Sequence, residues 1–140
     1  MISYLSIEHV MAIHDTLVEQ FGGILGIRDK GLLDSAIRQP EQSFGGVDLY
    51  PSLFDKASAY AFSISENQPF LDGNKRTAAS TANAFLDLNG YELDCPQGHV
   101  YNVMMALANK RLSRERLAAW FEKNSKKKSR SHKSKKRKKS

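Results

Sequence analysis

The chain has 140 residues, 41% of them hydrophobic, so we expect one domain with a single core. No apolar run approaches the roughly 20 residues of a membrane-spanning helix. The first residues, which include Glu8, lack the charged and then apolar order of a signal peptide. Cys95 is the only cysteine, which excludes an internal disulfide and a cysteine zinc site. We therefore expect a cytoplasmic protein without membrane contact.

The net charge of +6 combines two parts of opposite sign. Ten of the 21 Lys and Arg residues lie in residues 126–140, which leaves 11 against all 15 acidic residues in residues 1–125. A segment this basic cannot bury apolar surface and repels itself, which predicts a domain over 1–125 and a disordered tail over 126–140. Two interpretations of the tail stay open: a solubilising extension, or an arm that contacts nucleic acid through its phosphates.

In the first half of the chain, helical spacing and capping residues predict two helices. The first follows Ser6 and ends at the glycine pair 22–23. After a loop, Asp29 caps a short helix that ends before Pro40. Residues 42–51 contain glycines and aromatic residues without a helical period. They predict an exposed flap or short hairpin.

The second half predicts four more helices, over residues 51–66, 74–89, 98–109 and 114–123. Gly90 supplies a left-handed cap for the second of these, and Ser113 caps the last. The helix over 74–89 is rich in Ala and Ser, which lets neighbouring backbones approach closely. The expected fold is therefore all-α, a helical bundle around a central helix of small residues, with at most a small β flap.

Two cations, Lys75 and Arg76, stand at the start of that central helix, where the helix dipole opposes each by about 0.3–1 kcal/mol. They become favourable once a phosphate occupies the helix N-terminus, which is an anion site. Gly73 allows close backbone approach, and Asp72 offers a carboxylate for Mg²⁺. Asn74 either donates to a phosphate or caps the helix. These residues predict nucleotide phosphate binding; the alternative is a simple capping turn with solvated cations.

Residues 68–78, QPFLDGNKRTA, resemble the signature H-x-F-x-[D/E/N]-[G/A]-N-[K/G]-R of the Fic/Doc superfamily. Lys75 resembles the Doc, or death-on-curing, branch. So does Ala79, which stands where the nucleotidyl-transferring Fic branch has a second arginine. The similarity covers residues 4–125, and the basic tail has no counterpart in it.

The resemblance implies a toxin of a toxin–antitoxin system that is inhibited by a Phd-type antitoxin. It implies transfer of phosphate, or of a nucleotide, from ATP with Mg²⁺ to a hydroxyl group of a translation factor such as elongation factor Tu. Such a transfer would inhibit translation.

By position, the resemblance implies four phosphate-binding residues, Gly73, Asn74, Lys75 and Arg76. Lys75 and Arg76 would also neutralise charge on the transferred group. Asp72 would hold Mg²⁺, and Phe70 would anchor the loop in the core. The flap at 42–51 would align a segment of the target by extended pairing.

Gln68 occupies the position of the motif histidine, which is the general base of the family. An imidazole with a pKa near 6.5 can take a hydroxyl proton, whereas an amide can only position the hydroxyl. General base catalysis contributes about 10²–10⁴-fold in rate, so we expect phosphate binding with most catalysis lost. Three explanations of Gln68 stay open. It is a loss-of-function change that let a toxic gene be carried, or it is a feature of a natural pseudoenzyme, or Glu66 acts as the base in place of the histidine. The last is disfavoured because Glu66 is expected to point along the preceding helix.

Two other functions stay open. The chain can be a catalytically inactive binding protein on the Fic fold, for nucleotide, antitoxin or nucleic acid. It can also be a small helical RNA-binding protein acting through its tail, which leaves residues 72–76 unexplained. A metal site at His9 and His14 is disfavoured, because five residues of separation place them on different helix faces. We expect His14 to be packed in the core.

Overall fold

A computed structural model describes residues 1–96 and 98–129. Within that range the chain forms six α-helices and one 3-10 turn: α1 (Ile7–Phe21), α2 (Lys30–Arg38), η1 (Gln39–Glu41), α3 (Leu53–Asn67), α4 (Asn74–Leu88), α5 (His99–Ala108) and α6 (Arg114–Lys123). None of these helices is both long enough and apolar enough to cross a lipid bilayer. The expectation of a mostly helical bundle is confirmed.

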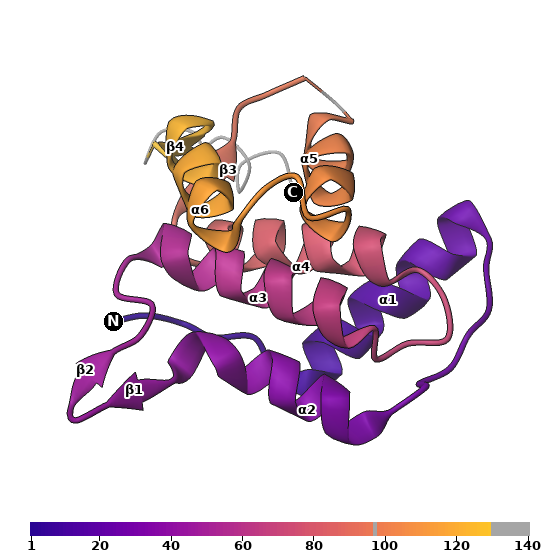
Figure 1. The fold of residues 1–140 in the computed structure, drawn as a ribbon. Helices are drawn as coiled ribbons and strands as arrows, with labels where there is room; N and C mark the ends of the chain where they lie inside the picture. Colours follow the sequence, from indigo (N-terminus) through magenta and orange to yellow (C-terminus); the bar gives the residue numbers. More distant parts are fainter. Residues whose placement is uncertain (97, 130–140) are drawn as a thin grey trace.

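The antiparallel helices α3 and α4 form the centre of the bundle (Figure 1). α3 packs against α2 and α6, and α4 packs against α1 and α5. Ala78 and Ala82 of α4 are fully buried, because their small side chains let the neighbouring helices approach. The prediction of a central helix of small residues is confirmed.

The capping residues act as the sequence indicates. The Ser6 hydroxyl accepts a hydrogen bond from the backbone N–H of His9 at the start of α1. The Asp29 carboxylate accepts from Leu32 at the start of α2, and Ser113 caps α6 in the same way. Each cap satisfies one of the N–H groups that a helix start leaves without a partner.

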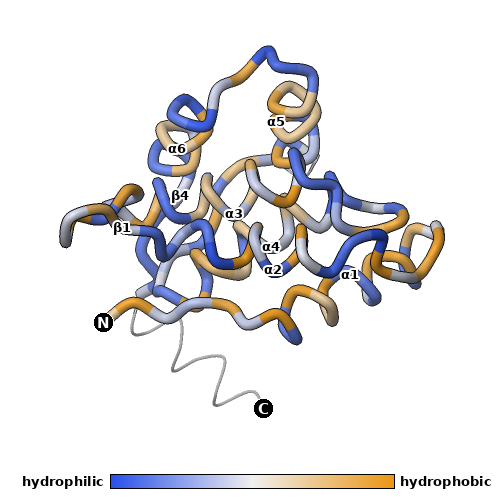
Figure 2. The backbone as a smooth tube through the Cα atoms, turned by 60° about the horizontal axis from the view of Figure 1, so that its bottom comes forward, coloured by the Kyte–Doolittle hydropathy of each residue, from blue (hydrophilic) through white to orange (hydrophobic). Residues whose placement is uncertain are grey.

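A hairpin of two short strands, β1 (Ser43–Phe44) and β2 (Val47–Asp48), projects from the body just before α3. Hydrophobic positions run along it (Figure 2), and the Phe44 side chain is 82% exposed. The base of the hairpin is fixed by Lys56 of α3, a buried lysine that donates to the Tyr50 carbonyl and contacts the Asp48 carboxylate at 3.4 Å. The predicted hairpin is therefore present, and it lies at the N-terminal end of α3.

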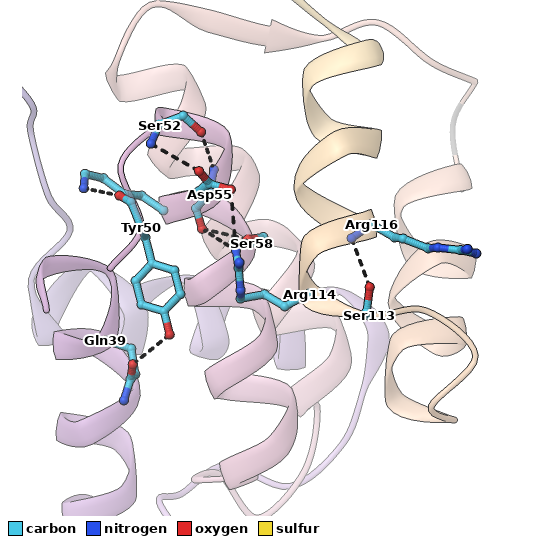
Figure 3. A network of polar contacts seen from close by, with 9 residues as sticks. Gln39, Tyr50, Ser52, Asp55, Ser58, Ser113, Arg114 and Arg116 are labelled. Carbon is cyan, nitrogen blue, oxygen red and sulfur yellow. Dashed lines mark hydrogen bonds and ion pairs between the residues drawn. The ribbon is translucent and has the colours of Figure 1, made fainter. Parts of the chain in front are cut away.

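Arg114 joins α6 to this region (Figure 3). It donates to the Ser58 hydroxyl at 2.7 Å, lies 3.7 Å from the Asp55 carboxylate, and stacks 4.8 Å from the Tyr50 ring centroid. Its side chain is only 19% exposed, so these contacts are shielded from water.

We expect Arg114→Ala to lower the free energy of unfolding by about 1–3 kcal/mol, because it removes charge-assisted hydrogen bonds in a shielded setting. Urea denaturation measures this loss. Arg116→Ala is the matched control on the same helix, because the exposed Arg116 side chain makes no ion pair with any described residue; its effect should stay within about 0.5 kcal/mol. Equal losses for the two variants would contradict the assigned role of Arg114.

The sequence did not predict a second small sheet, in which β3 (Tyr91–Leu93) pairs antiparallel with β4 (Ser125–Lys127). Lys126 lies 3.9 Å from both the Glu92 and Asp94 carboxylates, and Lys128 pairs with Asp87. The predicted boundary of the tail at residue 126 is therefore wrong, since 125–127 form a strand and both Lys126 and Lys128 pair with acidic residues of the domain. The rest of the predicted tail, 130–140, lies outside the described residues.

Candidate phosphate-binding site

The loop between α3 and α4 forms one wall of a hollow of about 380 Å³. The other walls are the end of α3, the start of α4 and part of α5. Six predicted site residues line the hollow together: Gln68, Asp72, Gly73, Asn74, Lys75 and Arg76. The seventh, Phe70, lies beneath the loop at 2% exposure. The structure thus brings the predicted residues to one place, with Phe70 as the core anchor.

Gln68 is the residue at which the chain leaves α3. It adopts a left-handed conformation (φ 45°, ψ 57°), and its N–H donates to the Ile64 carbonyl. A left-handed residue at this position is a common way to end a helix, although it is strained for residues other than glycine. The turn leaves the Gln68 side chain exposed at the rim of the hollow.

The segment 22–29, which links α1 to α2, holds the loop from outside. Leu71 donates to the Gly26 carbonyl at 3.1 Å, and Ile27 pairs with Phe70 in an antiparallel bridge. The Arg28 guanidinium donates to the carbonyls of residues 67 and 68 at 2.7 Å each. A cation at these last carbonyls of α3 is favourable, so Arg28 fixes the end of the helix.

His14 supports the loop from below. One ring nitrogen, Nε2, lies 2.7 Å from the Asp72 carbonyl oxygen and donates to it. The His14 ring stacks on the Phe70 ring at 3.8 Å between centroids, with 6° between the planes. The expectation of a packed core histidine is confirmed, with 1% exposure, and His14 also fixes the backbone beside the proposed metal residue.

Of the two predicted alternatives for the Asn74 side chain, capping of α4 is wrong, and donation to a phosphate stays a prediction. The Asn74 amide donates to the Phe70 carbonyl and its oxygen accepts from the Phe70 N–H, each at 3.0 Å. These two bonds hold the ends of the segment 70–74 together, and the second N–H of the amide takes no part in them. Helix α4 has no side-chain cap, because its N-cap is Gly73 in a left-handed conformation (φ 75°).

The first turn of α4 therefore offers backbone donors to the hollow. The N–H groups of Asn74, Lys75 and Arg76 have no partner within the helix because of their position, and the dipole of α4 favours an anion there. Lys75 is half-buried at the wall of the hollow. A phosphate at this point would meet backbone donors and a cation together.

Asp72 fits the requirements of a magnesium ligand. One carboxylate oxygen accepts from the Gly73 N–H at 2.9 Å, and the side chain is exposed at the hollow. A Cβ atom on Gly23 would lie 2.9 Å from the other oxygen, so only glycine leaves room beside the carboxylate. Among the described residues no group of three His, Cys, Asp or Glu side chains forms a metal site. A single carboxylate suits Mg²⁺ that is bound mainly by substrate phosphates and water.

Arg76 and Glu66 are fixed in different ways. The Arg76 guanidinium lies between the rings of Phe21 and Tyr101, with Cζ 4.5 and 4.9 Å from the ring centroids. These cation–π contacts offset the cost of a cation at the helix start, since each is worth about 0.5–1 kcal/mol. Glu66 binds the Lys110 ammonium at 3.0 Å. This ion pair holds Glu66 beside the hollow and opposes a role as general base.

The hairpin at 42–51 does not line the hollow, and the role implied for it, alignment of a segment of the target, stays a prediction. The hairpin lies at the N-terminal end of α3, whereas the loop follows the C-terminal end (Figure 1). The segment beside the loop is 22–29, to which the sequence assigned only a connecting role. The three glycines of this segment and Arg28 were the sequence features that could have indicated its contact with the loop.

Comparisons with known proteins show the family of the chain. The model of the Fic/DOC family matches residues 4–86. The chain is similar to "Toxin Doc" of Mycolicibacterium smegmatis, with 51% identity over 73 residues, covering 52% of this chain and 56% of the relative. The chain thus spans little more than half the length of that relative. It is also similar to "Protein kinase doc" of Escherichia phage P1, with 30% identity over 95 residues, covering 67% of this chain and 75% of the relative. The chain belongs to the Fic/DOC family, in its Doc branch.

Proposed function

We propose that this chain is a Doc-type toxin that binds ATP at the start of α4. The observation that carries the proposal is the uncapped helix start with Gly73 in a left-handed conformation and Lys75 beside it. Both relatives support it through their names, one a toxin and one a protein kinase. The expected setting is the cytoplasm, with a Phd-type antitoxin as partner.

The proposed reaction moves the terminal phosphate of ATP to a hydroxyl of a translation factor such as elongation factor Tu. The hydroxyl oxygen forms a bond to the γ-phosphorus, the bond from phosphorus to the bridging oxygen breaks, and ADP leaves; the hydroxyl proton passes to water, because the Gln68 amide cannot take it. Backbone N–H groups of residues 74–76 and the Lys75 ammonium stabilise charge on the phosphates. Asp72 would hold Mg²⁺, which supplies charge neutralisation when bound. Transfer of a nucleotide instead of phosphate would use the same donors.

The hydroxyl of the target would approach at the rim beside Gln68. Leu71 lines the hollow and is 53% exposed. In the adjoining segment 22–29, Ile24 and Leu25 are 60% and 59% exposed. We assign contact with the target to these exposed apolar side chains, which lie on the loop and on the segment that holds it.

Isothermal titration of the protein with ATP and Mg²⁺ tests the proposal. We expect saturable binding by the wild type. Lys75→Ala should lower the affinity for ATP by about tenfold or more, because a charge-assisted hydrogen bond is lost. Lys123→Ala, at the end of α6 and outside the hollow, should bind like the wild type. Absence of binding by the wild type would overturn the proposed function.

A catalytically inactive binding protein is the second candidate, and Gln68 favours it. An amide can accept a hydrogen bond from the attacking hydroxyl but cannot take its proton. Binding of ATP without any transfer would support this second function. Nucleic-acid contact through the tail receives no support from Lys126 and Lys128, since acidic residues of the domain pair with both.

A further inference from the structure

Two exposed aromatic rings contact the side chain of the motif arginine. Phe21 is the last residue of α1 and is 59% exposed; Tyr101 lies in the first turn of α5 and is 37% exposed. The Arg76 guanidinium lies between their rings, as given above. Neither residue belongs to the hydrophobic core cluster or packs against it, so core packing does not explain their positions.

The way in which Arg76 is held leaves its charge available. Arg38 and Arg114 both contact carboxylates, at 2.9 and 3.7 Å, whereas Arg76 forms no ion pair with any residue that the structure describes. A carboxylate would fix Arg76 equally well, but it would cancel the positive charge and repel a phosphate. An aromatic ring attracts the cation through its quadrupole and carries no net charge. Two rings therefore restrict the guanidinium while leaving a full positive charge.

Arg76 lies where three hollows meet. It lines the candidate phosphate site, the groove between α1, α4 and α5, and the smaller hollow that also contains Asp72 and His14. A flexible arginine at such a junction has several directions open to it, and it would lose side-chain freedom on binding an anion. The rings remove this freedom before the ligand arrives, and such preorganisation strengthens binding.

We propose that Phe21 and Tyr101 are positioning residues that hold Arg76 ready for a phosphate of the bound nucleotide. This inference rests on the proposed function, because it assigns the anion as part of ATP in the same site. According to this inference, α1 and α5, which lie outside the motif, also contribute to binding of the nucleotide. The inference also explains why two large aromatic side chains are exposed beside the hollow.

Isothermal titration with ATP and Mg²⁺ on ring-removing variants tests the inference. We expect Phe21→Leu and Tyr101→Leu each to weaken binding about two- to fivefold, and the double variant about tenfold. Tyr101→Phe keeps the ring and should restore wild-type affinity. Phe44→Leu is the matched control, since Phe44 is an exposed aromatic residue on the hairpin. Wild-type affinity in the double variant would overturn the inference.

Nuclear magnetic resonance of the arginine Nε–Hε groups separates this inference from the proposed function. The Hε signal of Arg76, assigned with Arg76→Lys, should be displaced by the two rings. It should return toward the usual arginine position in the double variant and stay displaced in Tyr101→Phe. If the wild type does not bind ATP, the proposed function is wrong even when the signal is displaced. If the signal does not respond to loss of the rings, the positioning role is wrong even when ATP binds.

Discussion

Gln68→His is expected to raise the rate of phosphate transfer by about 10²–10⁴-fold, the usual contribution of a general base. The imidazole can take the hydroxyl proton as the bond to phosphorus forms, which the amide cannot do. The exchange should also fit the backbone. Residue 68 has φ 45°, a conformation in which histidine is found several times more often than most residues.

Transfer is measured with purified elongation factor Tu as acceptor, by ADP release and by the mass of the acceptor protein. Gln68→Asn is the control, because asparagine accepts the left-handed conformation but is still an amide. It should remain as slow as the wild type. An increase with Gln68→Asn equal to that with Gln68→His would show that backbone strain, and not a missing base, limits the reaction.

Induced expression in bacterial cells extends the same comparison to toxicity. Growth arrest by the histidine variant alone would show that the phosphate site is intact and that the base is the missing part. Arrest by both proteins would mean that another group takes the proton, or that arrest does not need catalysis. Arrest by neither protein, together with no transfer in vitro, would contradict the toxin function.

The helices could be predicted because their signals are local. Four of the described helices, α1, α2, α3 and α6, begin at a capping residue whose side chain binds the N–H three positions later, as with Ser6 and Ser113. The β3–β4 sheet could not be predicted in this way. Its strands have three residues each and are separated by more than 30 positions, and a lysine-rich strand has the composition of a disordered tail. It is stabilised instead by distant acidic partners such as Asp87.

The positions of the site residues in the sequence were sufficient to predict that they lie together, but not to predict which contacts each side chain makes. The Asn74 amide binds the backbone of the loop, and Arg76 lies between rings from two distant helices. Both contacts depend on tertiary packing that no spacing within residues 68–76 reveals.

Phe70→Ala is expected to lower the free energy of unfolding by about 3–5 kcal/mol, the usual cost of removing a buried phenyl ring. The ring is 2% exposed and stacks on the buried His14 ring, so its loss leaves a cavity directly beneath the loop. Urea denaturation measures the change. Phe44→Ala, at a position that is 82% exposed, is the matched control and should change stability by less than about 0.5 kcal/mol.

The same substitution should weaken ATP binding beyond its effect on stability. Phe70 carries the two backbone groups that bind Asn74 and the antiparallel bridge to Ile27, and a loop that loses its anchor samples other positions. The first N–H groups of α4 then no longer converge on one phosphate. Titration below the unfolding transition distinguishes the two effects. Normal affinity in a destabilised Phe70→Ala protein would show that Asn74 and segment 22–29 hold the loop without the buried ring.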